Sequence, residues 1–228
     1  MEGEHGKRTN IFAAIQRYSP RAAADCLNRV RQRIRPLLLR GRLEKLCRDA
    51  PSFMTIRNTF VSAHATLCAV HYVLGIGDRH LSNFMVDERS GGLVGIDFGY
   101  AFGAGVQVIA IPELVPFRLT AQLAGVAAPH SVEVDSPFGA VMVAALGALR
   151  ARRRPLLDLM RVFVDEPSVD WMAYAKRIEM QSPRDPQAEV EDGMDVEDEE
   201  WRRLAWYPAE KLKVVERKLA GDNPVSIM

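Results

Sequence analysis

The sequence predicts a mainly α-helical domain that carries one small β-hairpin. Apolar side chains recur at helical spacing before residue 75 and again after residue 137, while two short apolar runs separated by a glycine turn lie between residues 84 and 96. The chain has 228 residues, 48% of them hydrophobic and 26% charged, which is enough to bury a substantial core. We therefore expect one globular unit.

The first elements are expected to be helices. Residues 19–48 are rich in Arg, Leu and Ala with apolar residues at helical spacing, which indicates one or two amphipathic helices. Their arginines could contact nucleic-acid phosphates, but without interleaved aromatic residues a solvated face is the better interpretation. Residues 58–74 indicate a buried helix, on which His64 and His71 read as packed histidines because no third metal ligand is near. The expected buried face consists of Phe60, Ala63, Leu67 and Val70.

A β-hairpin is expected next. Phe84-Met85-Val86 and Leu93-Val94-Gly95-Ile96 are short apolar runs, and Ser90-Gly91-Gly92 between them is a turn signal. This hairpin would bring the residues that precede and follow it to one cleft.

Two packing helices are expected in the second half of the chain. Residues 138–149 and 156–164 have helical patterns, and the basic segment between them predicts a surface turn because it ends in a proline that can start a helix. Residues 189–200 contain eight acidic residues and no basic ones, which predicts a disordered insert over about 185–200. A helical pattern resumes over 201–219.

The spacing of four polar residues around the hairpin is the strongest functional signal. Asp78 precedes Asn83 by five positions, and the D-F-G triplet that begins at Asp97 follows Asn83 by fourteen. Transfer of a phosphoryl group from ATP needs a base near the acceptor hydroxyl and ligands for magnesium, and protein kinases carry these groups at such spacing. The loop triplet reads Asp-Arg-His, so His80 follows the Asp by two residues and could share proton handling. The pattern predicts a phosphoryl-transfer site.

These segments resemble the phosphatidylinositol 3-kinase-related protein kinases. The resemblance rests on G-I-G-D-R-H-L-S-N-F-M at 75–85, I-D-F-G-Y-A-F-G at 96–103 and P-E-L-V-P-F-R-L-T at 112–120, and it covers roughly residues 35–227. It implies the C-terminal lobe of a kinase fold of the PI3K/PI4K type. Later segments, such as V-F-V-D-E-P-S-V-D-W from Val162, favour a branch of the family that acts in DNA repair.

The resemblance assigns catalytic and metal-binding roles to the residues of the loop and the D-F-G triplet. It implies that Asp78 is the catalytic base and that His80 is its partner in the loop. It also implies that Asn83 and Asp97 hold Mg2+ and so contact the bound nucleotide, with ATP as the phosphate donor.

Other residues are expected to shape the site. The resemblance implies that Met85 and Ile96 form the apolar floor beneath the adenine ring of ATP, which suits a flat heterocycle. Arg79 is expected to be a structural cation. Tyr100 stands where the resemblance leads us to expect His after D-F-G, which affects the packing of the activation segment and leaves the magnesium ligands intact.

The resemblance also implies a domain organisation. Residues 1–34 match poorly and read as a helical N-terminal segment, whereas residues 35–227 correspond to a kinase C-lobe with its catalytic loop at 75–83 and its activation segment at 97–120. A complete kinase needs an N-lobe with a phosphate-covering loop and a strand lysine. Neither pattern precedes residue 75, so we expect the N-lobe to be missing from this chain and the fragment to be inactive alone.

The activation segment distinguishes two classes of acceptor. Residues 98–117 contain no Lys or Arg, whereas a phosphoinositide head group would need cations, so a protein acceptor is favoured over a lipid. The resemblance further implies phosphorylation of Ser or Thr followed by Gln, in DNA double-strand break repair by non-homologous end joining. Its implied partners, in the full-length protein, are a DNA-end-binding heterodimer and DNA ends.

Composition excludes several other classes. A formal net charge of +1 gives no overall drive toward nucleic acid or membranes. Three cysteines without paired spacing argue against a disulfide framework or a zinc site and indicate a reducing compartment. The polar N-terminus and the lack of a long apolar run predict a soluble, intracellular chain with no membrane partner. A nuclear location is implied by the resemblance alone.

Three functions remain open at this point. The leading one is the C-lobe of a DNA-repair Ser/Thr protein kinase. A phosphatidylinositol kinase of the same superfamily is second, and the uncharged activation segment disfavours it. A noncatalytic docking or vestigial lobe is third. The missing N-lobe favours this third reading, while the intact Asp78, Asn83 and Asp97 disfavour it.

Overall fold

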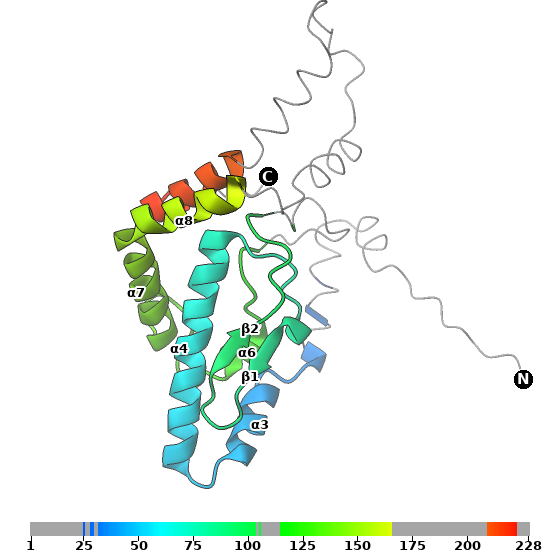
Figure 1. The fold of residues 1–228 in the computed structure, drawn as a ribbon. Coiled ribbons are helices and arrows are strands. Elements are labelled where there is room, and N and C mark those ends of the chain that lie inside the picture. The colour runs from blue at the N-terminus through cyan, green and yellow to red at the C-terminus, as the bar shows by residue number, and fades with distance from the viewer. Residues whose placement is uncertain are drawn as a thin grey trace, which may run out of the picture.

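A computed structural model of the chain shows one long helix, α4 (Ala50–Leu74), surrounded by the other elements (Figure 1). It describes residues 32–103, 115–165 and 209–222, together with positions 25, 28, 29 and 105. The other elements are α3 (Leu38–Leu46), the 3-10 turn η1 (Leu81–Asn83), β1 (Phe84–Val86), β2 (Leu93–Gly95), α6 (Ala121–Gly125), α7 (Pro137–Ala151), α8 (Arg153–Asp165) and a helix over 209–220. The prediction of a mainly helical domain with one small hairpin is confirmed.

Helix α4 begins at Ala50, well before residue 58, where the apolar pattern placed its start. The side chain of Asp49 caps the helix, because its Oδ1 accepts a hydrogen bond from the Ser52 N–H at 2.8 Å. Pro51 is tolerated in the first turn, where a backbone N–H would have no helical partner. These residues set where the helix begins. The periodicity of apolar side chains cannot reveal this start, because it depends on the cap and not on apolar residues.

Two faces of α4 are buried. The predicted face packs toward α3, the hairpin and α6, where Phe60 is fully buried in a cluster with Leu43 and Leu93. The other predicted members of this face, Ala63, Leu67 and Val70, are only half-buried, so the prediction holds for Phe60 alone. The opposite face, which includes Val61 and Cys68, packs toward α7 in a second cluster, and apolar periodicity missed it because its small residues do not stand out in the sequence. Figure 1 shows α4 between the hairpin and α7.

Strands β1 and β2 pair antiparallel, with Phe84 opposite Gly95, Met85 opposite Val94 and Val86 opposite Leu93. The side chains alternate across this hairpin, so Leu93 is buried toward α4 while Met85 and Val94 are exposed on the outer face. Gly91 sits in the turn at φ 80, a left-handed conformation that favours glycine. The predicted hairpin and its turn are confirmed.

Helices α7 and α8 are separated by a single residue, Arg152. The predicted surface turn over the basic segment was therefore wrong in extent: α7 continues to Ala151 and α8 begins at Arg153. Pro155 lies within the first turn of α8, where its missing N–H costs no helical hydrogen bond. Helix 209–220 runs beside α8 across the end of α4 (Figure 1). The buried core there consists of Val73, Leu157, Met160, Val215 and Leu219.

Several sequence-based predictions fall outside the described residues. These include most of the helical pattern before residue 32, residues 106–114 of the activation segment, the acidic insert and residues 201–208. The boundary at residue 34 also stays a prediction. Within the described part of the chain, no helix is both long and apolar enough to cross a membrane.

Candidate active site

The chain leaves α4 through Gly75 and enters the predicted catalytic loop. Gly75 has φ 58, and its N–H donates to the carbonyl of His71, which closes the last turn of the helix. A β-carbon at this position would lie 2.7 Å from the backbone nitrogen of Gly103, closer than real contacts allow. The glycine therefore permits both the turn and the close approach of the segment that follows D-F-G.

The start of the loop runs beside the segment after D-F-G. Three backbone hydrogen bonds join them, from Gly77 to the Tyr100 carbonyl at 2.7 Å, from Phe102 to the Leu74 carbonyl at 2.7 Å, and from Gly103 to the Gly75 carbonyl at 2.8 Å. Tyr100, where His was expected, takes part through its backbone oxygen. The pairing of the two segments therefore does not depend on which side chain stands there.

The side chain of Arg79 ties the catalytic loop to the strand that precedes D-F-G. It is 1% exposed, and its Nε donates to the Gly77 carbonyl at 2.7 Å. Its Nη1 donates to the Ile96 carbonyl at 2.9 Å, and its Nη2 donates to the carbonyl of Asp97. The guanidinium also lies 5.5 Å from the centre of the Phe98 ring. The prediction that Arg79 is a structural cation is confirmed by these contacts.

Asn83 is held just as firmly between the loop and the hairpin. It is 5% exposed, and its side-chain Nδ2 donates to the Asp78 carbonyl at 2.8 Å. Its backbone carbonyl accepts from the N–H of Ile96 at 3.0 Å, which extends the pairing of β1 and β2 by one residue. Since the amide nitrogen is occupied, the Oδ1 atom is the one left to face a cation.

Asp78, the predicted base, and Asp97, a predicted magnesium ligand, both adopt left-handed backbone conformations. Asp78 has φ 56 and Asp97 has φ 58, which residues with a side chain adopt rarely and which cluster at functional sites. The Asp97 carboxylate is exposed and accepts from the Gly99 N–H at 3.3 Å. His80 Nε2 lies 3.9 Å from Asp78 Oδ2, which is too far for a hydrogen bond. Both aspartates thus have a strained backbone, and the Asp97 side chain is exposed while that of Asp78 is partly exposed.

Met85 and Ile96, the predicted adenine floor, lie on the outer face of the hairpin. Met85 is 58% exposed and Ile96 is 37% exposed, and Val94, opposite Met85, is 56% exposed. The three side chains form one open apolar surface beside Asn83 and Asp97 in the chain. Val94 was not predicted as part of this surface, although its register opposite Met85 follows from the hairpin.

His64 and His71 are both 1% exposed, which confirms the prediction that they are packed helix histidines. Burial, with a smaller contribution from the charge of Arg79, lowers the pKa of His71 to about 4. The ring of His71 lies 6.4 Å from the ring of Phe98 in the D-F-G triplet. This contact between α4 and the triplet was not predicted, because sequence spacing carries no signal for a contact made across the fold. Burial also lowers the pKa of His64, whose Nε2 contacts the Arg118 carbonyl at 3.0 Å.

Asn83 and Asp97 offer oxygen atoms that suit a magnesium ion whose other ligands come from water and a substrate. Among the described residues no three His, Cys, Asp or Glu side chains gather as a metal site. Magnesium commonly binds through one or two carboxylates together with waters and substrate phosphates, and does not require an all-protein cage. The carboxylate of Asp97 and the amide oxygen of Asn83 fit that mode.

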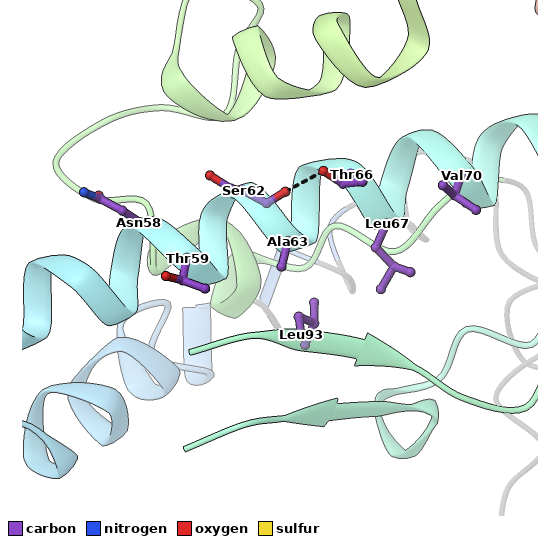
Figure 2. Close-up of a pocket in the computed structure, with 8 residues that line it drawn as sticks. All are labelled: Asn58, Thr59, Ser62, Ala63, Thr66, Leu67, Val70 and Leu93. Carbon is purple, nitrogen blue, oxygen red and sulfur yellow. Dashed lines mark hydrogen bonds between the residues drawn. The ribbon is translucent and has the colours of Figure 1, made fainter. Parts of the chain in front are cut away.

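A separate groove of about 720 Å3 runs along α4 against β2 (Figure 2). Its lining consists of Asn58, Thr59, Ser62, Ala63, Thr66, Leu67, Val70 and Leu93. None of these is titratable, and none is a predicted catalytic residue. The groove therefore offers no charge to a phosphate and is distinct from the candidate active site.

A family model described as phosphatidylinositol 3- and 4-kinase matches residues 30–173, more than half of the chain. The matched range includes the catalytic loop, the hairpin and the D-F-G triplet. The chain belongs to the phosphatidylinositol 3- and 4-kinase family. Within this family, the relatives identify the protein-kinase branch that the motifs indicated.

The DNA-dependent protein kinase catalytic subunit of Gallus gallus is 42% identical over 190 residues, and that of Canis lupus familiaris is 36% identical over 220 residues. The serine/threonine-protein kinase TEL1 of Yarrowia lipolytica is 30% identical over 187 residues. These matches cover 83%, 96% and 82% of this chain, but 4%, 5% and 8% of the respective relatives. The resemblance to the phosphatidylinositol 3-kinase-related protein kinases is confirmed, and the chain spans less than a tenth of these relatives' length.

The fold has a solved counterpart. The structure of the FAT and kinase domain of CtTel1 superposes with a TM-score of 0.69 at 24% sequence identity, covering 95% of this chain and 13% of that one. The architecture around the catalytic loop is therefore that of a PI3K-like kinase fold.

Proposed function

We propose that this chain forms the catalytic-loop part of a Ser/Thr protein kinase that transfers the γ-phosphate of ATP to protein hydroxyls. The observation that supports this most strongly is the way Arg79 and Asn83 hold the two aspartate backbones. Arg79 donates to the carbonyl of Asp97, and Asn83 donates to the carbonyl of Asp78 at 2.8 Å. Each of the two segments is thereby anchored by a side-chain hydrogen bond to the backbone of its aspartate, which supports a site that must hold a base and a metal ligand in place.

In this proposal, Asp78 orients the acceptor hydroxyl and receives its proton. His80, whose Nε2 lies 3.9 Å from Asp78 Oδ2, would share in handling that proton. Asn83 and Asp97 would hold Mg2+, which when bound with ATP neutralises charge on the transferred phosphate. The exposed apolar surface of Met85 and Ile96 would receive the adenine ring. In a complete kinase, an N-lobe would cover this surface.

The acceptor is proposed to be a protein. The relatives include proteins named DNA-dependent protein kinase catalytic subunit and serine/threonine-protein kinase, and the activation segment here has no Lys or Arg between residues 98 and 117. By this relationship we propose Ser or Thr followed by Gln as acceptor, action in DNA double-strand break repair by non-homologous end joining, a nuclear location, and a DNA-end-binding heterodimer and DNA ends as partners of the whole protein.

The proposal is tested by phosphate transfer from labelled ATP, using the protein that carries this chain, purified from its native source or expressed at full length. A Ser-Gln peptide should be phosphorylated and a phosphatidylinositol vesicle should not. Asp78→Asn should reduce the peptide rate at least about 100-fold, because the base is lost. Asp135→Asn is the matched control, since Asp135 is exposed and far along the chain from the loop. Transfer to the lipid alone, or an unchanged rate for Asp78→Asn, would refute the assignment.

A further inference from the structure

Exposed arginines lie where α7 meets α8 and farther along α8. We call Arg152, Arg153, Arg154 and Arg161 the arginine patch. Arg153, Arg154 and Arg161 line a hollow of about 610 Å3 between α8 and helix 209–220, together with Asp158 and Glu216. Three of the four patch residues therefore line a concave surface that is formed by two elements distant in the sequence.

The charge of the patch is only partly compensated. Arg161 pairs with Asp158 at 2.8 Å, and Glu216 lies across the hollow. Among the described residues, no carboxylate lies within 4.0 Å of the side chains of Arg152, Arg153 or Arg154. Guanidinium groups bind carboxylates in a planar, two-point geometry that lysine does not offer. A carboxylate-rich segment is therefore a chemically suitable occupant.

The chain itself contains such a segment. Residues 189–200 hold eight acidic and no basic residues, and we call them the acidic tract. The tract carries −8 and the whole chain +1, so the remainder of the chain carries +9. The tract thus holds eight of the 29 acidic residues of the chain, and the rest of the chain is basic on balance.

The connectivity gives the tract enough reach to contact the patch. Helix α8 ends at Asp165 and the next described helix begins at residue 209, so the tract lies in the connection between the two elements that form the hollow. The nine positions from residue 200 to residue 209 can span about 30 Å, more than the length of α8. Tethering gives such a segment an effective concentration on the order of millimolar, which suits a contact made of several weak ion pairs.

We propose that the acidic tract docks on the arginine patch of its own chain. The contact would be electrostatic, weakened by salt and open to competition by other anions. A polyphosphate such as duplex DNA is the competing occupant. We favour the tract because it belongs to the same chain as the patch. Its negative charge also nearly matches the excess positive charge on the rest of the chain.

The test uses the full 228-residue chain and a fluorescein-labelled peptide with the sequence of residues 189–200. In a tract-neutral variant, every Glu of the tract becomes Gln and every Asp becomes Asn. By fluorescence anisotropy at low ionic strength, the tract-neutral chain should bind the peptide, and the wild-type chain should bind it at least about tenfold more weakly because its own tract occupies the patch.

Substitutions locate the binding. Arg152→Gln, Arg153→Gln and Arg154→Gln, combined in the tract-neutral chain, should weaken peptide binding about tenfold. The control combines Arg33→Gln, Arg48→Gln and Arg89→Gln, three exposed arginines elsewhere, which removes the same charge and should have much less effect. If circular dichroism shows that the patch variant does not fold, the three Arg→Lys substitutions replace it and should weaken binding by a smaller factor.

Several results would overturn the proposal. One is equal affinity of the peptide for the wild-type and tract-neutral chains, since the tract would then not occupy the patch. Another is an equal effect of the patch and control substitutions. A third is no peptide binding to the tract-neutral chain. If the patch then binds a labelled DNA duplex instead, it is a nucleic-acid surface.

Discussion

At the scale of single residues, the buried guanidinium of Arg79 joins two segments of the site, the catalytic loop and the residues that lead into D-F-G. It donates to carbonyls of the catalytic loop and of the residues that lead into D-F-G. Hydrogen bonds from a charged donor in a buried setting stabilise more than neutral ones. The same side chain thus affects both the stability of the fold and the position of Asp97.

Arg79→Lys is expected to lower the free energy of unfolding by about 3 kcal/mol, because a single ammonium cannot reach the carbonyls that the guanidinium spans. Arg89→Lys, on the exposed turn of the hairpin, is the matched control and should change stability by less than about 0.5 kcal/mol. Urea unfolding of the two variants measures the difference. Equal stability of both would contradict the structural role given to Arg79.

The buried His71 should make stability depend on pH. Its pKa is about 4 in the fold against 6.5 in the unfolded chain, so the unfolded chain binds more protons between these values. Above pH 6.5 the contribution of His71 to the free energy of unfolding should be at its maximum. As the pH is lowered toward 4, the free energy of unfolding should fall by up to about 3 kcal/mol because of this residue. His71→Gln should flatten that dependence, and His130→Gln, at an exposed site, should leave it unchanged. Unfolding curves at several pH values measure it, and equal slopes for wild type and His71→Gln would count against the assignment.

At the scale of elements, the junction between α4 and the catalytic loop decides how the site is presented. Helix α4 carries His71 at its buried end and stops at Gly75, where the loop turns beside residues 100–103. Lys218, from helix 209–220, donates to the Tyr72 carbonyl at 2.7 Å and so satisfies one of the last carbonyls of α4. The end of α4 is therefore fixed from two sides.

Two glycine substitutions compare the stability requirement at this junction with that at an ordinary helix position. Gly75→Ala should destabilise the fold by more than about 1 kcal/mol, since Gly75 has φ 58 and a β-carbon would lie 2.7 Å from the Gly103 nitrogen. Gly147→Ala in α7 should stabilise by about 0.5–1 kcal/mol, because a β-carbon there meets nothing within 4 Å. Thermal unfolding gives the sign of each change. A stabilised Gly75→Ala would contradict the described turn.

Particular elements show how far sequence reasoning reached. The hairpin was predictable because Gly91 and Gly92 separate two apolar runs. The start of α4 was missed because its Asp49 cap is a local hydrogen bond rather than a periodic signal. The approach of His71 to Phe98 and the left-handed backbone of Asp78 depend on the packed fold, so no spacing in the sequence reveals them. The identities of the candidate catalytic residues came from motif spacing, whereas the contacts that hold them needed the structure.

At the scale of the whole molecule, three small cores in the described part of the chain pack around one helix. One supports the hairpin, one lies between α4 and α7, and one joins the end of α4 to α8 and helix 209–220. The same arrangement matches 95% of this chain to a kinase structure at a TM-score of 0.69. The chain thus has a kinase-family fold, and it spans less than a tenth of the length of these relatives.

The Mg2+ dependence of phosphate transfer tests the central claim most directly, measured for the wild-type protein, for Asp97→Asn and for the control Asp135→Asn. We predict that Asp97→Asn loses at least about 100-fold in rate and that its residual activity needs more Mg2+, since one ligand of the cation is removed. Asp135→Asn should match wild type. A wild-type rate and an unchanged Mg2+ requirement for Asp97→Asn would contradict the assignment of this site to phosphoryl transfer.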